Sequence, residues 1–263
     1  MVYMCIHSVR GAEMGKLNYH DTRKQTIVEL QNQIWARERG VSEKANRVYS
    51  TGCEDLDALL PHQGIRRGSL VEWVGSTSAS RAGTLSLIAG KQICPQVLPT
   101  VIIDVQHELF PLSLSLLGFD LSRVVLIRPN SEKEALWACE EALRSEAIGV
   151  VWANIERMNS TSFRRLQLAV EASAGIGFLV RSAQALKQPS WAEARLLVHP
   201  LRSLHGSPCV RVELASSYRK LKHSQADIVI DSVKGTLYGT NTTANPLPLV
   251  SQLGVTATYQ HSA

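Results

Sequence analysis

The stretch that decides the fold is residues 70–87, LVEWVGSTSASRAGTLSL. Its first six residues form an apolar run that ends at Gly75, and a helical pattern begins near Thr84. A strand that leads through a short turn of small and polar residues into a helix is the setting of the phosphate-binding loop G-x-x-x-x-G-K-[ST]. Here Ser80 stands where the second glycine belongs, and no Gly-Lys-Thr follows. The stretch therefore has the frame of a nucleotide site without its central residues.

Each part of a phosphate loop has its own task. Glycines turn backbone N–H groups toward the phosphates, a lysine reaches the β and γ oxygens, and a hydroxyl holds Mg²⁺. In this chain Arg81 or Ala82 falls at the lysine position, depending on a gap of one residue, and no hydroxyl follows until Thr84. The planar guanidinium of arginine does not substitute freely for lysine, and Lys91 lies too far along the helix to reach back. By itself, the stretch favours an ordinary strand–turn–helix junction.

Beyond this stretch, strand-like and helix-like segments alternate along the chain. The first five strand candidates are nearly continuous apolar runs, which is typical of strands buried on both faces of a parallel sheet. A later segment alternates apolar and charged residues in CVRVEL, which indicates antiparallel strands with one wet face. We expect strands at residues 70–74, 100–104, 124–127, 149–153, 177–181, 194–199, 209–214 and 227–231. We expect helices at residues 83–92, 111–117, 131–145 and 160–172.

These elements predict one large α/β domain with a mostly parallel central sheet, antiparallel strands toward the C-terminus and short additions at its ends. The expected organisation is a helical N-terminal segment at 1–46, an α/β core at 47–234 and a flexible tail at 235–263. Residues 21–39 of the first segment have apolar residues at helical spacing, a stripe that docks on the domain itself or on a partner. The tail is rich in Gly, Thr, Asn and Pro.

Composition limits the classes of function. The 263 residues carry a net charge of +5 and a pI of about 9.0, which fits contact with nucleic acid or an acidic partner without demanding either. The five cysteines are scattered and form no C-x-x-C pair, so neither a zinc site nor a disulfide framework is expected. We expect a cytoplasmic protein with no signal peptide. No apolar run of about 18 residues occurs, so no membrane span is expected.

ATP hydrolysis needs two further groups, an Asp at the end of a core strand to hold Mg²⁺ and a Glu to activate water. The strand GVVWA ends in the uncharged Ala153, followed by Asn154. After the strand TVIID, Gln106 has the shape of the required Glu but cannot accept a proton. Glu108 shares a face with Gln106 if the stretch is extended, so it stays open as a substitute. We interpret Asp104 as a turn former rather than an ion ligand.

Three segments together resemble the core of the bacterial recombinase RecA. They are STGCEDLDALLPHQGIRRGSLVEWVG, VIIDVQHELFPLSLSLLGFDLSRVVLIRP and EKEALWACEEALRSEAIGVVWAN, and the resemblance covers roughly residues 47–181. It implies a RecA-like phosphate-loop core. Carried over by position, the loop lysine becomes Arg81 or Ala82, the catalytic Glu becomes Gln106 and the magnesium Asp becomes Ala153. The absence of three residues that one reaction requires predicts a retired active site, one that no longer performs the reaction.

A retired site of this kind predicts a protein without catalytic residues and without a metal site. The loop positions become vestigial nucleotide contacts, namely Gly75, Ser80, Arg81 and Thr84. No cofactor is expected, and bound ATP with Mg²⁺ is the alternative.

Within the superfamily, the pattern is most similar to the ImuA family, the shorter recombinase-like accessory proteins of mutagenic translesion synthesis. QPSWAEARLLVHPL followed by a Val-Glu-Leu strand resembles that family's segment after the core. The family's Arg-Gly-Gly after this strand is replaced here by residues 217–220, SYRK. The resemblance implies a non-catalytic adaptor in SOS-linked DNA repair, working with a Y-family polymerase homologue and an error-prone replicative-type polymerase. It also suggests contact with single-stranded DNA or a recombinase filament, in the cytoplasm and at most associated with the nucleoid.

Two other functions stay open. One is an active DNA-dependent ATPase or recombinase that uses Glu108 as the base and Arg81 in place of the lysine. The other is an interaction protein similar to the SOS inhibitors of cell division.

Basic and aromatic residues outside the loop are the candidate contacts with DNA or partners. They are Arg157, Arg164, Arg165, Trp191, Arg219, Lys220 and Lys222. The first three lie just past a core strand, where the resemblance implies a DNA-contacting loop; a solvated helix start capped by Asn159 or Ser160 explains them equally. The last three form the strongest basic cluster, which a charged hairpin loop also explains. Trp191 anchors a partner if it is exposed and only packs if it is buried.

Overall fold

The structure is a computed structural model that describes residues 47–94, 98–204, 206–217 and 225–240. The predicted helical segment at 21–39 and the basic cluster at 219–222 lie outside the described residues. Within the described residues, no helix is long and apolar enough to cross a membrane.

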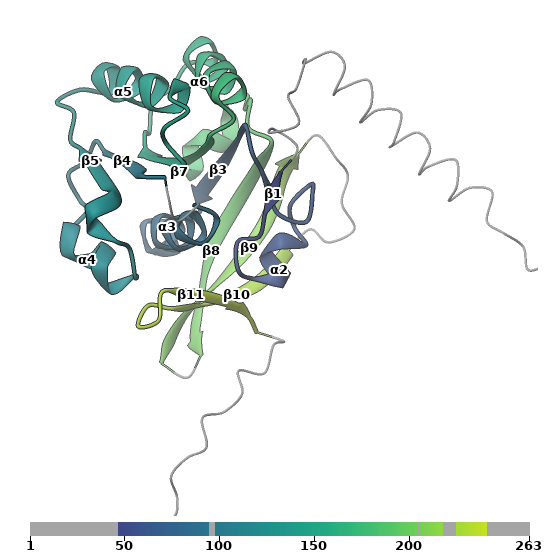
Figure 1. The fold of residues 1–263 in the computed structure, drawn as a ribbon. Helices are drawn as coiled ribbons and strands as arrows, with labels where there is room; N and C mark the ends of the chain where they lie inside the picture. Colours follow the sequence, from purple (N-terminus) through teal and green to yellow (C-terminus); the bar gives the residue numbers. More distant parts are fainter. Residues whose placement is uncertain (1–46, 95–97, 205, 218–224, 241–263) are drawn as a thin grey trace, which may run out of the picture. The chain divides into compact units, whose positions relative to one another are not determined.

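A nine-stranded sheet forms the centre of the described core, in the order β11-β10-β9-β8-β3-β7-β6-β4-β5 (Figure 1). Its parallel strands are β3 (Ser69–Gly75), β4 (Thr100–Asp104), β5 (Val124–Ile127), β6 (Val150–Asn154), β7 (Ile176–Ser182) and β8 (Ala194–Leu204). The antiparallel strands that follow are β9 (Ser207–Ser217), β10 (Gln225–Asp231) and β11 (Thr236–Gly239). The predicted α/β architecture, mostly parallel with antiparallel strands toward the C-terminus, is therefore confirmed.

Helices cover the two faces of the sheet as separate layers (Figure 1). On one face lie α2 (Glu54–Asp57), α3 (Ala82–Ile93) and α4 (Pro111–Leu116), and on the other α5 (Glu132–Arg144) and α6 (Ser160–Ser173). Because side chains alternate along a strand, β3 sends Trp73 into the first layer and Leu70 into the second. Trp73 meets Phe178 edge to face, with ring centroids 5.4 Å apart. Every residue of β3 is buried, as its apolar run predicts.

Short elements complete the described core. A two-stranded sheet pairs β1 (Val48–Tyr49) with β2 (Ile65–Arg66), ahead of β3. Single 3-10 turns are formed by η2 (Ser78–Ser80), η3 (Leu121–Arg123) and η4 (Ala183–Lys187). All eight predicted strands and all four predicted helices are present, with ends shifted by a few residues at most in all but β8 and β9, which are longer.

The predicted boundary of the flexible tail is wrong for its first residues. Thr236–Gly239 form β11, an edge strand that pairs with β10, and Leu237 is buried in the core. The turn before it is ordered because Asp231 accepts hydrogen bonds from the backbone of Val233 and Lys234, while Gly235 takes a left-handed conformation. Two adjacent hydrophobic residues, Leu237 and Tyr238, are too weak a signal for a strand in this otherwise polar stretch. Residues 241–263 lie outside the described residues.

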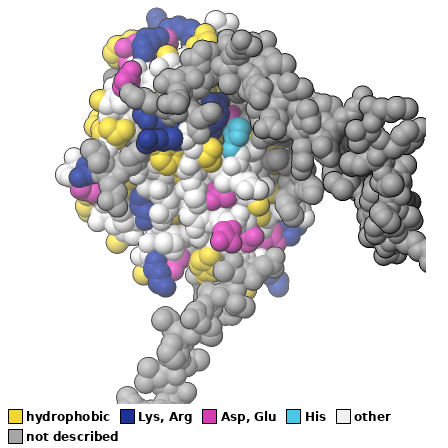
Figure 2. Space-filling view, turned by 45° about the vertical axis from the view of Figure 1, so that its right-hand side comes forward, with side chains coloured by type: hydrophobic (Ala, Val, Ile, Leu, Met, Phe, Trp, Pro, Cys, Tyr) yellow, Lys and Arg dark blue, Asp and Glu magenta, His cyan; other side chains and the backbone are white. Residues whose placement is uncertain are grey.

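The described core carries no net excess of either charge. Its Lys and Arg residues equal its Asp and Glu residues in number, so the net charge of +5 belongs to the remaining residues. Figure 2 shows basic and acidic side chains interspersed on the face that it displays. A general attraction of this core to polyanions is therefore not expected.

Candidate functional site

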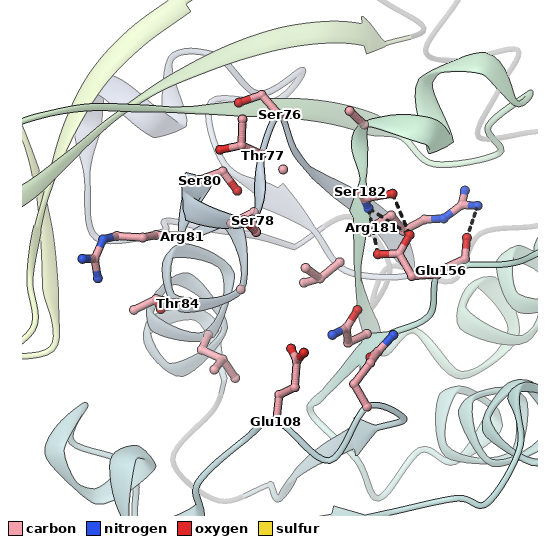
Figure 3. Close-up of a pocket in the computed structure, with 18 of the residues that line it drawn as sticks. Ser76, Thr77, Ser78, Ser80, Arg81, Thr84, Glu108, Glu156, Arg181 and Ser182 are labelled. Atoms are coloured by element: carbon pink, nitrogen blue, oxygen red, sulfur yellow. Dashed lines mark hydrogen bonds between the residues drawn. The ribbon is translucent and has the colours of Figure 1, made fainter.

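A pocket of about 720 Å³ opens at the carboxyl ends of the parallel strands, the edge at which open α/β sheets bind ligands (Figure 3). It lies between the loop after β3 and the segments that follow β4, β6 and β7. Five of the sequence-predicted positions line it together, namely Gly75, Ser80, Arg81, Thr84 and Gln106. Ala153 does not line it.

The backbone of the loop after β3 indicates which residue aligns with the lysine position. Arg81 has a left-handed backbone with φ of 59°, the conformation for which glycine is favoured, and α3 begins at Ala82. By backbone conformation Arg81 therefore takes the place of the second glycine, and Ala82, the first helical residue, takes the place of the lysine. The sequence had given the glycine position to Ser80. Ser80 is instead buried next to Gly75. Any side chain at position 75 would collide with the Ser80 hydroxyl.

No amine or guanidinium of this loop reaches into the pocket. Ala82 is buried and has no polar side chain. The Arg81 side chain is exposed and extends away from Glu108 and Glu156, which lie across the pocket (Figure 3). Thr84 lines the pocket and supplies a hydroxyl. Lys91 is engaged elsewhere, because its amine donates to the backbone carbonyls of Leu117 and Gly235 at 2.8 Å each.

The segment after β4 is a tight turn that Asp104 organises. The buried Asp104 carboxylate accepts hydrogen bonds from the backbone N–H of Glu108 (3.1 Å) and Leu109 (3.0 Å), and the Nε atom of Arg128 lies 3.5 Å away. The interpretation of Asp104 as a turn former is confirmed. His107 has a left-handed backbone, so Gln106 and Glu108 both line the pocket through a turn rather than an extended stretch.

The end of β6 offers the pocket no charge. Ala153 is fully buried, paired between Ile103 of β4 and Leu179 of β7, and its neighbour Asn154 lines the pocket instead. Trp152 also lines the pocket, and sequence reasoning missed it. Its indole lies beside Gly83 of α3, and its Nε1 atom donates to the Ser86 hydroxyl at 2.8 Å. The segment GVVWA contains the bulky Trp152, but the direction of its side chain is known only from the register of β6 with β4 and β7.

A third carboxylate, Glu156, was also missed by sequence reasoning. It lines the pocket and accepts hydrogen bonds from Ser182, at 3.1 Å from the backbone N–H and 2.7 Å from the hydroxyl (Figure 3). The pocket is thus lined by three carboxylates, those of Asp104, Glu108 and Glu156. Its lining also includes two arginines, the outward-pointing Arg81 and the buried Arg181. Arg181 is already paired with Glu72 and Asp104 with Arg128, so the lining offers a triphosphate no unpaired cation, while Glu108 adds a negative charge.

Beneath the pocket lies a buried ion network on β3, β7 and β8. The Glu72 carboxylate receives the Nη1 atom of Arg181 at 2.8 Å and the Nε atom of Arg195 at 2.6 Å, and the Ser190 hydroxyl donates to it at 2.8 Å. Arg181 also donates to the side chain of Gln188, and Arg195 to its backbone carbonyl. The segment from Gln188 to Ser190 is therefore fixed to the sheet by buried charges.

The pocket geometry can now be set beside known proteins. Residues 26–160, just over half of the chain, match the family model of the RecA N-terminal domain. The chain belongs to the RecA N-terminal domain family. The RecA proteins of Rhodopirellula baltica (33% identical over 113 residues), Clostridium novyi (34% over 105) and Haemophilus ducreyi (34% over 105) are similar to it. These alignments cover 40–43% of this chain and 28–30% of each relative.

A RecA-type core implies ATP and Mg²⁺, and the residues of this pocket do not fit them. The lysine position is Ala82, and the end of β6 supplies Asn154 rather than a carboxylate. Gln106 replaces the residue that would activate water. Among the described residues, no group of three or more His, Cys, Asp and Glu side chains is arranged to hold a metal ion.

The other predicted contact residues separate into two places. Arg164 lies over the Trp191 ring at 4.9 Å, and the Trp191 indole donates to the Ser160 hydroxyl at 3.1 Å. Trp191 is 42% exposed, so it is available as a contact. Arg157 and Arg165 instead line a groove beside α5. Asn159 is the cap of α6, since its side chain accepts from Ser162 N–H at 2.8 Å.

An exposed apolar surface at the β5 edge was not foreseen from the sequence. Large apolar side chains are exposed on and around α4 and β5, namely Phe110, Leu112, Leu116, Leu121 and Val125. β5 is the last strand of the sheet on this side, and within the described residues it pairs only with β4. A sheet edge flanked by apolar side chains is a surface suited to binding another chain. We call these five residues the α4–β5 surface.

Proposed function

We propose that this protein is a non-catalytic RecA-like adaptor in SOS-linked, error-prone translesion synthesis and DNA repair. Its partners would be a Y-family polymerase homologue and a replicative-type mutagenic polymerase, with single-stranded DNA or a recombinase filament as further contacts. The observation that supports the non-catalytic part is the left-handed backbone of Arg81, because it aligns Ala82, which has no amine, with the lysine position. The translesion part rests on the similarity of the segment around QPSWAEARLLVHPL to the ImuA family.

An adaptor needs surfaces for partners, and the α4–β5 surface meets that need. Five large apolar side chains in a described region would each contact water in the isolated protein. Trp191, stacked with Arg164, adds an aromatic and basic contact on another part of the core.

One observation favours a second candidate, an ATPase with relocated groups. Glu108 is exposed and its carboxylate points into the pocket (Figure 3), where a general base would stand. This candidate would still need a cation at the γ-phosphate, which the outward Arg81 side chain does not supply in this structure.

Nucleotide binding and turnover on the full chain separate the two candidates. A fluorescent ATP analogue and a phosphate-release assay would each be used with and without Mg²⁺ and single-stranded DNA. The adaptor proposal requires that there is no turnover, and the lining of the pocket predicts that there is no binding either. Turnover that requires Mg²⁺, increases with DNA and disappears in Glu108→Gln but not in the exposed control Glu146→Gln would contradict it. Binding without turnover would make the nucleotide a structural ligand and retain the non-catalytic proposal.

The partner proposal needs its own test. Purified Y-family and replicative-type polymerases would be titrated against the wild-type chain and against the double variant Phe110→Ser, Leu116→Ser. We expect binding to one polymerase that weakens at least tenfold in the double variant, since these side chains are exposed and their loss should leave the fold intact. The exposed Leu168→Ser serves as the matched control. Absence of binding to both polymerases would refute this part.

A further inference from the structure

A groove of about 550 Å³ lies between α5 and the segment that leads into α6. It shares no lining residue with the pocket at Gly75. The residues that define it are Lys133, Leu136, Trp137, Met158, Arg165 and Leu166, and we call it the Trp137 groove. Neither the retired site nor the Trp191 stack accounts for it.

Trp137 is the feature that needs an explanation. Its side chain is 65% exposed, whereas Trp73 and Trp152 are buried and Trp191 is stacked with Arg164. Within the described residues, no stacked cation and no hydrogen bond is found for Trp137. An indole left in water exposes a large apolar area that burial in an interface would stabilise.

The groove next to Trp137 has an apolar floor. Met158 and Leu166 are buried there, and Leu136 is half-buried beside them. A partner's apolar side chain that entered the groove would contact these residues and the indole together. Such a pocket is typical of the centre of a protein interface, where tryptophan is enriched among the residues that dominate affinity.

The charges around the groove indicate the chemistry of the partner. Both oxygens of Glu140 are already occupied, by Arg144 at 2.6 Å and by Arg165 at 2.6 Å. Lys133 and Arg157 have no ion pair within the described part of the chain, and both line the groove. The acidic Glu132 also lines it, so the excess is modest and positive. A carboxylate beside the apolar anchor would complement Lys133 and Arg157.

We propose that the Trp137 groove binds an amphipathic helical segment of a partner protein, with an apolar anchor flanked by carboxylates. A groove between packed secondary-structure elements accepts the apolar ridge of such a helix. A nucleic acid strand is disfavoured because α5 also presents exposed Glu134 and Glu141, and because the described core has no net positive charge to attract phosphates. This inference does not depend on the identity of the polymerase partners.

Fluorescence anisotropy with a defined probe tests the proposal on the full chain. The probe is a labelled peptide of about 18 residues with leucines along one helical face and glutamates on the other. Wild type is expected to bind it, and Trp137→Ala to weaken binding about tenfold or more. Arg157→Glu should weaken binding to this probe and strengthen binding to the same peptide with lysines in place of glutamates. Leu168→Ala, an exposed apolar change outside the groove, should have no effect.

Folding is the control for these variants. Because Trp137 and Arg157 are exposed, both variants should unfold at the wild-type temperature. Failure of wild type to bind the acidic peptide, or equal binding by Trp137→Ala, would overturn the proposal. Binding of oligodeoxythymidylate that is lost in Trp137→Ala would also overturn it, because the groove would then be a nucleic-acid site.

Discussion

Glu72 and Gly75 lie three residues apart in β3, but the side chains around them differ in whether they complete the chemistry of the site. Around Glu72, two arginines and a serine satisfy one buried carboxylate. Around Gly75, the groups that nucleotide chemistry needs are replaced by Ala82, Gln106 and Asn154. The same strand therefore supports a network in which both oxygens of the Glu72 carboxylate are bonded, and a pocket that lacks the groups of nucleotide chemistry. We therefore expect the fold to depend on the Glu72 network and not on the residues of the pocket.

The largest expected effect comes from breaking the network. Glu72→Gln keeps the size of the side chain but leaves Arg181 and Arg195 buried without their counter-charge, so we expect a loss of about 3–5 kcal/mol in the free energy of unfolding. Urea denaturation would measure it. As a control, Arg144→Ala removes an exposed partner of Glu140 and should lower the free energy of unfolding by about 1 kcal/mol or less. A loss below 1 kcal/mol in Glu72→Gln would show that the network is not needed for the fold.

A second paired carboxylate, Glu193, is expected to make the stability of the core depend on pH. Burial raises the pKa of Glu193, but contacts with His62 and Arg66, each at 3.0 Å, outweigh burial and hold the pKa below its usual value. A depressed pKa gives stability that is present above the unfolded value of about 4.3 and is lost as pH falls through the folded value. Glu193→Gln should lower the free energy of unfolding at pH 6 by about 1.5–3 kcal/mol.

The matching measurement is urea denaturation at pH 6 and near pH 3. The stability that wild type loses between the two should be larger than the stability that Glu193→Gln loses. Glu146→Gln, at an exposed position, should follow the wild type. Parallel pH profiles for wild type and Glu193→Gln would show that Glu193 has no part in acid sensitivity.

In the loop after β3, unlike at Glu72 and Glu193, replacing a charged residue should not lower the stability of the protein. Arg81 holds a left-handed backbone that costs a residue with a side chain about 1 kcal/mol, so Arg81→Gly should leave stability unchanged or raise it by about that amount. Ala82→Gly, one residue later in the first helical turn, should instead destabilise by about 1 kcal/mol. Thermal unfolding of the two variants would compare them. A destabilised Arg81→Gly would mean that the Arg81 side chain has a role that its exposure does not reveal.

The smallest effect is expected at Trp191. A double-mutant cycle with Arg164→Ala and Trp191→Ala should give a coupling of about 0.5 kcal/mol, as for an exposed cation–π pair. A coupling of zero would show that the pair is not formed in solution, and Trp191 would then be freer to bind a partner.

The sequence was sufficient for the architecture. Apolar runs such as TVIID identified the parallel strands, because strands buried on both faces leave an unbroken apolar pattern. The alternation in CVRVEL identified the antiparallel part, which β9 confirms. The absence of a lysine beside Thr84 was also visible in the sequence, and it is the basis for predicting a retired site.

The directions of side chains and the contacts between residues far apart in the chain could not be predicted from the sequence. Whether Trp152 faces the pocket depends on the register of β6 with β4 and β7. Ser182 holds the Glu156 carboxylate at the pocket, and nothing in the spacing of these residues indicates that contact. The place of Arg81 was ambiguous because two alignments were equal in sequence, and only the sign of a backbone angle separated them.

The Glu72 network also bears on how the chain is made. Arg181 and Arg195 follow Glu72 by 109 and 123 residues, so the ribosome delivers them on the order of 10 s after β3 has emerged. During that interval β3 is an unpaired apolar strand with one charge at its centre. A charge in this position disfavours stacking of the nascent strand with other chains. We therefore expect Glu72 to disfavour aggregation of the unfinished chain, in addition to its place at the centre of the finished network.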